Sequence, residues 1–250
     1  MKSGTRRVAR SASRHSGSVE SLETRSLLTA LVINPDTRAG YLNAAGGLVI
    51  DNADMVGKDA LVIEGFSISA SSGNALTINL SGITLKSLAI ESMVVTQHTS
   101  VGMDISLTNV SGLRTIAVED VNIAGSRLGL DLTLTNTDAY AVTIDDSSIP
   151  GVKIEALAGS DIGHGLITES TIVAGAGFEG VLLNVNAGTA DNFHIENNLR
   201  ITSANRDFVR INSTNAPVDG LTIQNNQIGS LTQGSGLIFR ADGDTFVQPL

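Results

Sequence analysis

Carboxylate, imidazole and guanidinium side chains that could act together on a sugar occur in the middle and later part of the chain. They are Asp138, Asp145, Asp146, His164 and Arg210. An inverting glycosidase needs one protonated and one ionised carboxyl group, separated by room for a water molecule. A cation beside them can hold the sugar. These five residues are therefore the candidate catalytic set.

The short motifs around these residues resemble those of polygalacturonases. The chain reads Asn136-Thr137-Asp138, Asp145-Asp146, Gly163-His164-Gly165 and Arg210-Ile211, in the order of that family's Asn-Thr-Asp, Asp-Asp, Gly-His-Gly and Arg-Ile-Lys. The resemblance implies polysaccharide hydrolysis, but the spacing departs from it. Asp138 and Asp145 share one repeat, whereas the family places these motifs on successive coils, and Asn212 replaces the Lys. Turns favour the same residue types, so we expect turns here rather than a catalytic site.

A second acidic set recurs at one position of a repeating pattern. Acidic residues follow an apolar-x-apolar triplet at Glu64, Glu91, Glu119 and Asp145, and they stand one residue later at Asp120, Asp146 and Glu169. Stacked repeats would place equivalent carboxylates about 4.8 Å apart. That spacing raises their pKa values or attracts a cation, and Ca²⁺ prefers oxygen ligands of this kind. The candidate metal ligands are Glu119, Asp120, Asp145, Asp146 and Glu169. The alternative is a solvated acidic face that keeps the protein soluble.

The position of these residues follows from a repeat that runs through most of the chain. Its apolar anchors are separated by 27, 28, 26, 23, 28 and 28 residues, and they are Ile63, Ile90, Val118, Ile144, Ile167, Ile195 and Ile223. A second alternating run, such as Leu76-Thr77-Ile78-Asn79-Leu80, lies between anchors. Strict period 2 indicates strands, and a period of 20–50 residues indicates a stacked repeat.

The repeats resemble the right-handed β-helix proteins of the pectate-lyase-like superfamily, in which units of the type Ile-x-Asn-Asn recur once per coil. Ile195-Glu196-Asn197-Asn198 and Ile223-Gln224-Asn225-Asn226 match this unit. We therefore predict an all-β fold, a right-handed parallel β-helix of about seven coils of about 27 residues. The handedness follows from the resemblance and from the preference for right-handed parallel crossovers. Aromatic residues make up 3% of the chain and Trp is absent, which suits a narrow core.

The first residues form a separate segment. Residues 1–30 are predicted to be a basic, disordered export segment. Leu22, Glu23, Arg25, Leu27, Leu28 and Ala30 resemble the N-terminal motif of planctomycete extracellular proteins, although Thr24 replaces its usual Pro or Asp. The resemblance implies an extracellular or cell-surface location. Residues 31–47 are predicted to cap or lead into the solenoid, and 48–250 to form it.

The charge of the chain restricts its partners. Six of the 16 Lys and Arg and two of the 25 Asp and Glu lie in residues 1–30, so the remainder has 10 basic and 23 acidic residues, a net charge of −13. Nucleic acid is therefore not an expected partner. No segment approaches the ~20 apolar residues of a membrane span. The absence of Cys excludes disulfides and thiolate metal sites.

The function predicted from these observations is an exported scaffold or binding module with polysaccharide or Ca²⁺ as candidate ligands and without an identifiable catalytic site. A polysaccharide lyase or glycosidase is the alternative from another class. A further alternative is a surface protein that assembles end to end, because the run at Leu237–Arg240 begins a coil that Leu250 leaves incomplete. An open coil exposes backbone groups that can pair with a second copy.

Overall fold

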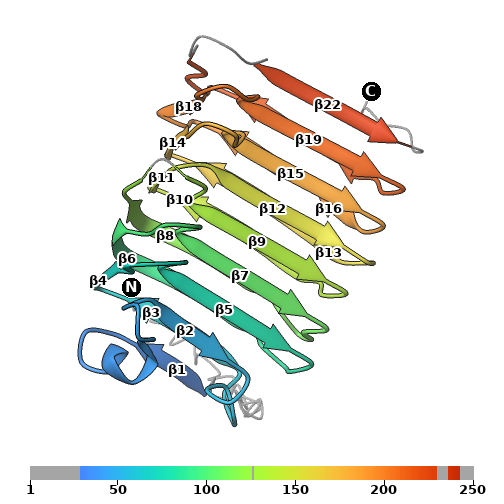
Figure 1. Ribbon diagram of the computed structural model, residues 1–250. Helices are drawn as coiled ribbons and strands as arrows, with labels where there is room; N and C mark the ends of the chain where they lie inside the picture. The colour runs from blue at the N-terminus through green and yellow to red at the C-terminus, as the bar shows by residue number, and fades with distance from the viewer. Residues whose placement is uncertain (1–28, 126, 230–235, 243–250) are drawn as a thin grey trace, which may run out of the picture.

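The computed structural model describes residues 29–125, 127–229 and 236–242. It is all-β, with 57% of residues in strands and no α-helix, and it forms a parallel β-solenoid of about seven turns with ~28 residues per turn (Figure 1). The predicted fold class is therefore confirmed. Most of the predicted export segment and residues 243–250 lie outside the described residues.

One side of the solenoid is an eight-stranded parallel sheet, which we call sheet B. Figure 1 shows its strands as a ladder that rises from β2 near the N-terminus to β22 near the C-terminus. In order, they are β2 (Leu48–Asp51), β5 (Leu76–Ser81), β7 (Met103–Thr108), β9 (Leu130–Thr135), β12 (Val152–Leu157), β15 (Val181–Asn186), β19 (Val209–Thr214) and β22 (Leu237–Asp242).

The other two sides belong to a 14-stranded sheet, sheet A, which bends at a corner. Its main path is β1 (Ala30–Ile33), β3 (Ala60–Glu64), β6 (Ser87–Gln97), β8 (Thr115–Ile123), β10 (Ala139–Asp145), β13 (Asp161–Thr168), β16 (Thr189–Asp191) and β20 (Val218–Asp219). Strands off this path are β4 (Ser67–Ser69), β11 (Ser148–Ile149), β14 (Thr171–Ala174), β17 (Phe193–Glu196), β18 (Arg200–Ser203) and β21 (Thr222–Gln224). One short 3₁₀-helix, η1 (Arg38–Tyr41), follows β1.

The core is a set of apolar columns, because inward side chains of successive coils stack in register. One column of sheet B is at most 1% exposed and consists of Leu48, Leu76, Met103, Leu130, Val152, Val181 and Val209. Each such side chain contributes ~1.5–3 kcal/mol on burial. Phe193 is the largest fully buried side chain, and Phe66 and Phe208 are the other buried aromatic residues among those that the structure describes.

The corner of sheet A is made by residues with left-handed backbone, φ between 42° and 75°. They are Gly65, Ser92, Asp120, Asp146, Glu169, Asn197 and Asn225. Asn is one of the residue types that adopt this conformation most readily. The Nδ2 of Asn225 donates to Oδ1 of Asn197 across the coils at 3.3 Å.

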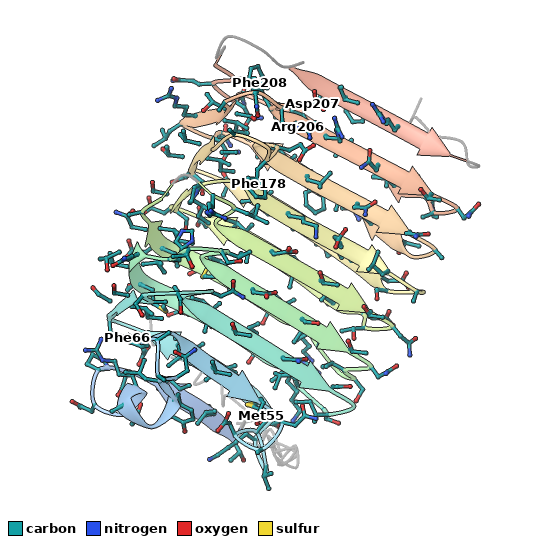
Figure 2. The ribbon with its side chains drawn as sticks, viewed as in Figure 1. Met55, Phe66, Phe178, Arg206, Asp207 and Phe208 are labelled. Carbon is teal, nitrogen blue, oxygen red and sulfur yellow. The ribbon has the colours of Figure 1, made fainter. Side chains whose placement is uncertain are left out.

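The residue after each corner points inward, and its type changes along the solenoid. In the first coils it is Phe66, Met93 and then Val121, all buried; Figure 2 labels Phe66 in the lower part of the stack. In later coils the position is polar, and we call Ser147, Ser170, Asn198 and Asn226 the inner polar ladder. From Val121 onward, the backbone N–H of the residue at this position donates to the side-chain oxygen of its equivalent in the next coil, at 3.1 Å in each of the four steps up to Asn226. The ladder thus satisfies polar groups that would otherwise be buried without partners.

The two ends of the described stack differ. β1 pairs in parallel with β3 and adds one strand below the first full coil. At the other end, Leu237 and Phe239 occupy inward positions in register with Val209 and Ile211, yet they are 43% and 42% exposed. Self-association through this end stays a prediction. In the described part of the chain no helix is long and apolar enough to span a membrane.

Candidate functional site

The predicted catalytic residues are not gathered at one point. Asp138 precedes β10 and Asp145 ends it, so the strand separates the two carboxyl groups by roughly 20 Å. Inverting glycosidases place their two carboxyl groups about 6.5–9.5 Å apart. Asp146 is at the corner of sheet A, and Arg210 belongs to β19 of sheet B.

Asp138 contacts the first residue of β13, and His164 is three residues further along that strand. Asp138 Oδ1 accepts the backbone N–H of Asp161 at 3.1 Å. The ring of exposed His164 meets that of Tyr140 edge-on, with centroids 5.0 Å apart. Burial raises the pKa of nearby Asp191, the carboxylates of Asp219 and Asp161 raise it further, and His164 opposes them.

Asp161, Asp191 and Asp219 were not singled out from the sequence. Asp191 pairs with Asp219 in register, and their separation of 28 residues equals the repeat. That spacing was the signal that could have found them. Asp161 instead pairs with Thr189, whose hydroxyl donates to Asp161 Oδ1 at 2.8 Å.

The acidic column has the register predicted for it. Glu64, Glu91, Glu119 and Asp145 pair one above the next across four coils. Asp120, Asp146 and Glu169 line a groove of about 210 Å³ at the corner of sheet A, together with Val121, Asn122, Ser147, Ser148, Thr171 and Leu199.

Ca²⁺ binding by this column stays a prediction. Asp120 Oδ2 already accepts a hydrogen bond from the hydroxyl of Ser92 at 2.9 Å. Within residues 29–125, 127–229 and 236–242, no group of three or more His, Asp or Glu side chains is arranged to hold a metal ion. The solvated acidic face predicted as the alternative therefore stays open as well.

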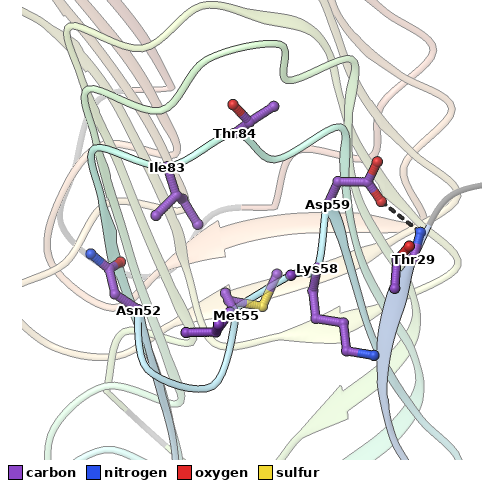
Figure 3. Close-up of a pocket in the computed structure, with 9 residues that line it drawn as sticks. Thr29, Asn52, Met55, Lys58, Asp59, Ile83 and Thr84 are labelled. Atoms are coloured by element: carbon purple, nitrogen blue, oxygen red, sulfur yellow. Dashed lines mark hydrogen bonds between the residues drawn. The ribbon is translucent and has the colours of Figure 1, made fainter.

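A groove of about 440 Å³ lies at the N-terminal end, between the loops before β3 and β6 (Figure 3). Asp59 is the acidic residue among those that line this groove. Its Oδ1 accepts the backbone N–H of Thr29 at 2.7 Å, and its Oδ2 lies 2.7 Å from Lys86 Nζ. The hydrogen bond from Lys86 is the main reason why the pKa of Asp59 is lowered. Asp59 thereby fastens β1 to the first coil, which is a structural role.

The outer surface of sheet B, which we call face B, carries three columns of side chains in register. The first column is Thr77, Asp104, Asp131, Lys153, Leu182, Arg210 and Ile238. The second is Asn79, Ser106, Thr133, Glu155, Asn184, Asn212 and Arg240. The third is Ser81, Thr108, Thr135, Leu157, Asn186, Thr214 and Asp242. Period-2 patterning identifies these outward positions, but it does not identify the contacts between coils.

An ion network occupies the middle of face B. Lys153 Nζ lies 3.2 Å from Asp131 Oδ2 and 2.8 Å from Glu155 Oε2, and Asn184 Nδ2 donates to Glu155 Oε1 at 2.9 Å. Burial raises the pKa of Asp131, Lys153 opposes it, and the carboxylates of Glu155 and Asp104 add to the rise, so that the pKa is raised on balance. Burial also acts on Glu155, but hydrogen bonds from Lys153 and Asn184 outweigh it and lower the pKa of Glu155.

The raised pKa of Asp131 gives a pH-dependent prediction. Its protonated form is favoured by folding, so its contribution to stability is present below its unfolded pKa and is lost as pH rises through the higher folded value. We expect Asp131→Asn to be as stable as the parent protein or more stable at pH 7, with the difference vanishing below pH ~4. Urea unfolding followed by circular dichroism across this range measures it.

The matched control is Asp104→Asn, one coil earlier in the same column. A loss of more than about 1 kcal/mol at pH 7 in Asp131→Asn alone would mean that the ion pair with Lys153 outweighs the cost of burying the charge.

Comparison of the chain with protein-family models, with curated proteins and with solved structures finds no match. The resemblances to polygalacturonases, to pectate-lyase-like proteins and to the planctomycete motif therefore rest on the short motifs that carry them.

Proposed function

We propose that the chain is a cell-surface binding module or scaffold that binds an extended polymer, such as a polysaccharide, along face B. The observation that carries this proposal is the unbroken register of face B from β5 to β22. Equivalent side chains recur there at about 4.8 Å. A polymer laid along the solenoid meets similar groups at each coil.

The chemistry of face B supports a polar ligand. Most of its outward side chains are hydroxyl, amide or ionised groups, and the apolar members of the columns are Leu157, Leu182 and Ile238. Hydroxyl-rich polymers need this mixture of donors and acceptors. Because aromatic platforms are absent from the columns, binding rests on many weak polar contacts rather than on a stacked ring.

The proposal includes export to the cell surface and the binding of Ca²⁺. The N-terminal motif around Leu22–Ala30 supports export, and the corner column with Asp120, Asp146 and Glu169 supplies carboxylates for Ca²⁺. A polysaccharide-degrading enzyme is the alternative class. Of its candidate residues, Asp138 contacts the first residue of β13 and His164 belongs to that strand, whereas Asp145 lies at the far end of β10.

The test is a panel of neutral and acidic polysaccharides presented to the full chain, with and without Ca²⁺. We expect binding in affinity electrophoresis without new reducing ends or unsaturated products. Asn184→Leu, in the second column of face B, should weaken binding at least several-fold. Thr115→Leu, on the exposed outer surface of sheet A, should not.

Two outcomes would overturn the proposal. Product formation that disappears in Asp145→Asn or His164→Ala would establish an enzyme. A folded protein that binds nothing in the panel would remove polymer binding by face B.

A further inference from the structure

The charges of face B are segregated along the solenoid. Asp104, Asp131 and Glu155 lie on β7, β9 and β12, together with Lys153. In the last two described coils, the first two columns carry Arg210 on β19 and Arg240 on β22, and the third column ends at Asp242, in register with Thr214. The first two columns are therefore basic at this end of face B, although the chain as a whole is acidic.

A groove of about 260 Å³ lies at this end and is rich in hydrogen-bond donors. Its lining residues are Asn184, Arg210, Asn212, Ser213, Thr214 and Arg240. None of these six carries a carboxylate. Guanidinium, amide and hydroxyl groups from three successive strands thus surround one space.

Two carboxylates, those of Asp207 and Glu179, hold the side chain of Arg210 in place. Its Nε and Nη2 donate to Asp207, and its Nη1 lies 3.3 Å from Glu179 Oε1. The three side chains are 20%, 8% and 13% exposed for Arg210, Asp207 and Glu179. Figure 2 labels Asp207 in the loop that leads into β19. Three of the five N–H donors of a guanidinium are used in this way, which leaves two for another acceptor.

Asp207 and Glu179 already balance the charge of Arg210. The positive charge offered to a ligand therefore comes from Arg240. Arg240 is exposed, pairs in register with Asn212 on the neighbouring strand, and makes no ion pair with any described residue. The backbones of Arg240 and Asn212 are thus one strand spacing apart, about 4.8 Å, and both side chains line the groove.

We propose that this groove binds a tetrahedral oxyanion, a sulfate or phosphate group carried by a larger ligand. Two guanidinium groups and two amides from different strands offer more donors than the two oxygens of a carboxylate can accept, whereas a sulfate or phosphate presents three or four oxygens. The site deepens the proposed function, because it specifies a group that the polymer on face B carries.

The acidic half of face B restricts where that group occurs. Glu155 lies two coils before Asn212 in the second column, roughly 10 Å away, which is about the screening length at physiological ionic strength. A uniformly anionic polymer along the whole face would be repelled there. The ligand therefore carries its oxyanion sparsely or at one end.

The experiment is a titration of the isotopically labelled full chain with inorganic sulfate, inorganic phosphate or acetate, at constant ionic strength set with NaCl. Amide shifts of Arg240 and Asn212 should saturate with sulfate or phosphate, and the tighter of the two identifies the source of the group. Arg240→Gln should weaken this binding roughly tenfold. The matched control is Arg200→Gln, which removes an exposed Arg from β18 of sheet A and should leave the affinity unchanged.

Several results would overturn the site: shifts that do not saturate, equal affinity for acetate, or an Arg240→Gln variant that binds as tightly as the parent. These results are separable from a failure of the proposed function, which is decided by polysaccharide binding and by Asn184→Leu.

Discussion

Asn198→Ala should destabilise the protein by about 3 kcal/mol. Asn198 is 1% exposed and is the most highly bonded member of the inner polar ladder. Its Oδ1 accepts the N–H of Ser170 at 3.1 Å, and its Nδ2 donates to the carbonyl of Ile167 at 2.9 Å and to Asn226 Oδ1 at 2.8 Å. Alanine leaves these buried groups without partners and opens a cavity.

Chemical unfolding followed by far-ultraviolet circular dichroism measures this effect. Asn198→Ser should recover part of the loss, because Ser170 fills the equivalent position of the preceding coil and its hydroxyl donates to the carbonyl of Thr168 at 2.7 Å. Asn122→Ala is the exposed control. If Asn198→Ala costs less than about 1 kcal/mol, water has replaced the side chain and the ladder does not stabilise the stack.

Gly165→Ala should cost about 3 kcal/mol by a different mechanism, the overpacking of a full core. Gly165 pairs in register with Phe193, which is 0% exposed. A Cβ at Gly165 would lie 2.0 Å from Cδ2 of the Phe193 ring, and that ring is enclosed by the core. Glycine is therefore required here because the next coil places a ring against its backbone.

A double-mutant cycle separates this clash from a general intolerance of alanine. Phe193→Leu alone should be destabilising, whereas the same change in the Gly165→Ala background should be less harmful or restore stability. Gly40→Ala is the control, because no atom lies within 4 Å of a Cβ added there. Additive effects of Gly165→Ala and Phe193→Leu would contradict the proposed clash.

The sequence was sufficient to predict the fold class and the register of the acidic column. Both follow from alternation, since one period-2 run per coil determines which side chains point inward and the anchors Ile63 to Ile144 align successive coils. The left-handed corners could also be predicted at Asn197 and Asn225, because Asn adopts this backbone conformation with little strain.

The candidate sites were less predictable, because they depend on contacts between coils. The ion network of Lys153 with Asp131 and Glu155 joins residues of two strands whose pairing requires the exact lengths of the intervening loops. Arg210 stood out in the sequence for its motif, but its carboxylate partners come from Asp207 and from Glu179, one coil earlier. Arg240 was not singled out because nothing in its local sequence indicates that it faces Asn212.

The stacking of one coil on the next also makes length an adjustable property of this molecule. Each coil contacts chiefly its two neighbours, so a whole repeat can be added or removed without altering the cross-section. Asn198 and Asn226 make equivalent contacts in successive coils, since each accepts the N–H of the preceding ladder residue and donates to a carbonyl, that of Ile167 or Ile195. Their coils are therefore a natural unit for duplication. Each added copy would lengthen face B by about 4.8 Å. The solenoid can therefore be fitted to ligands of different length in fixed increments.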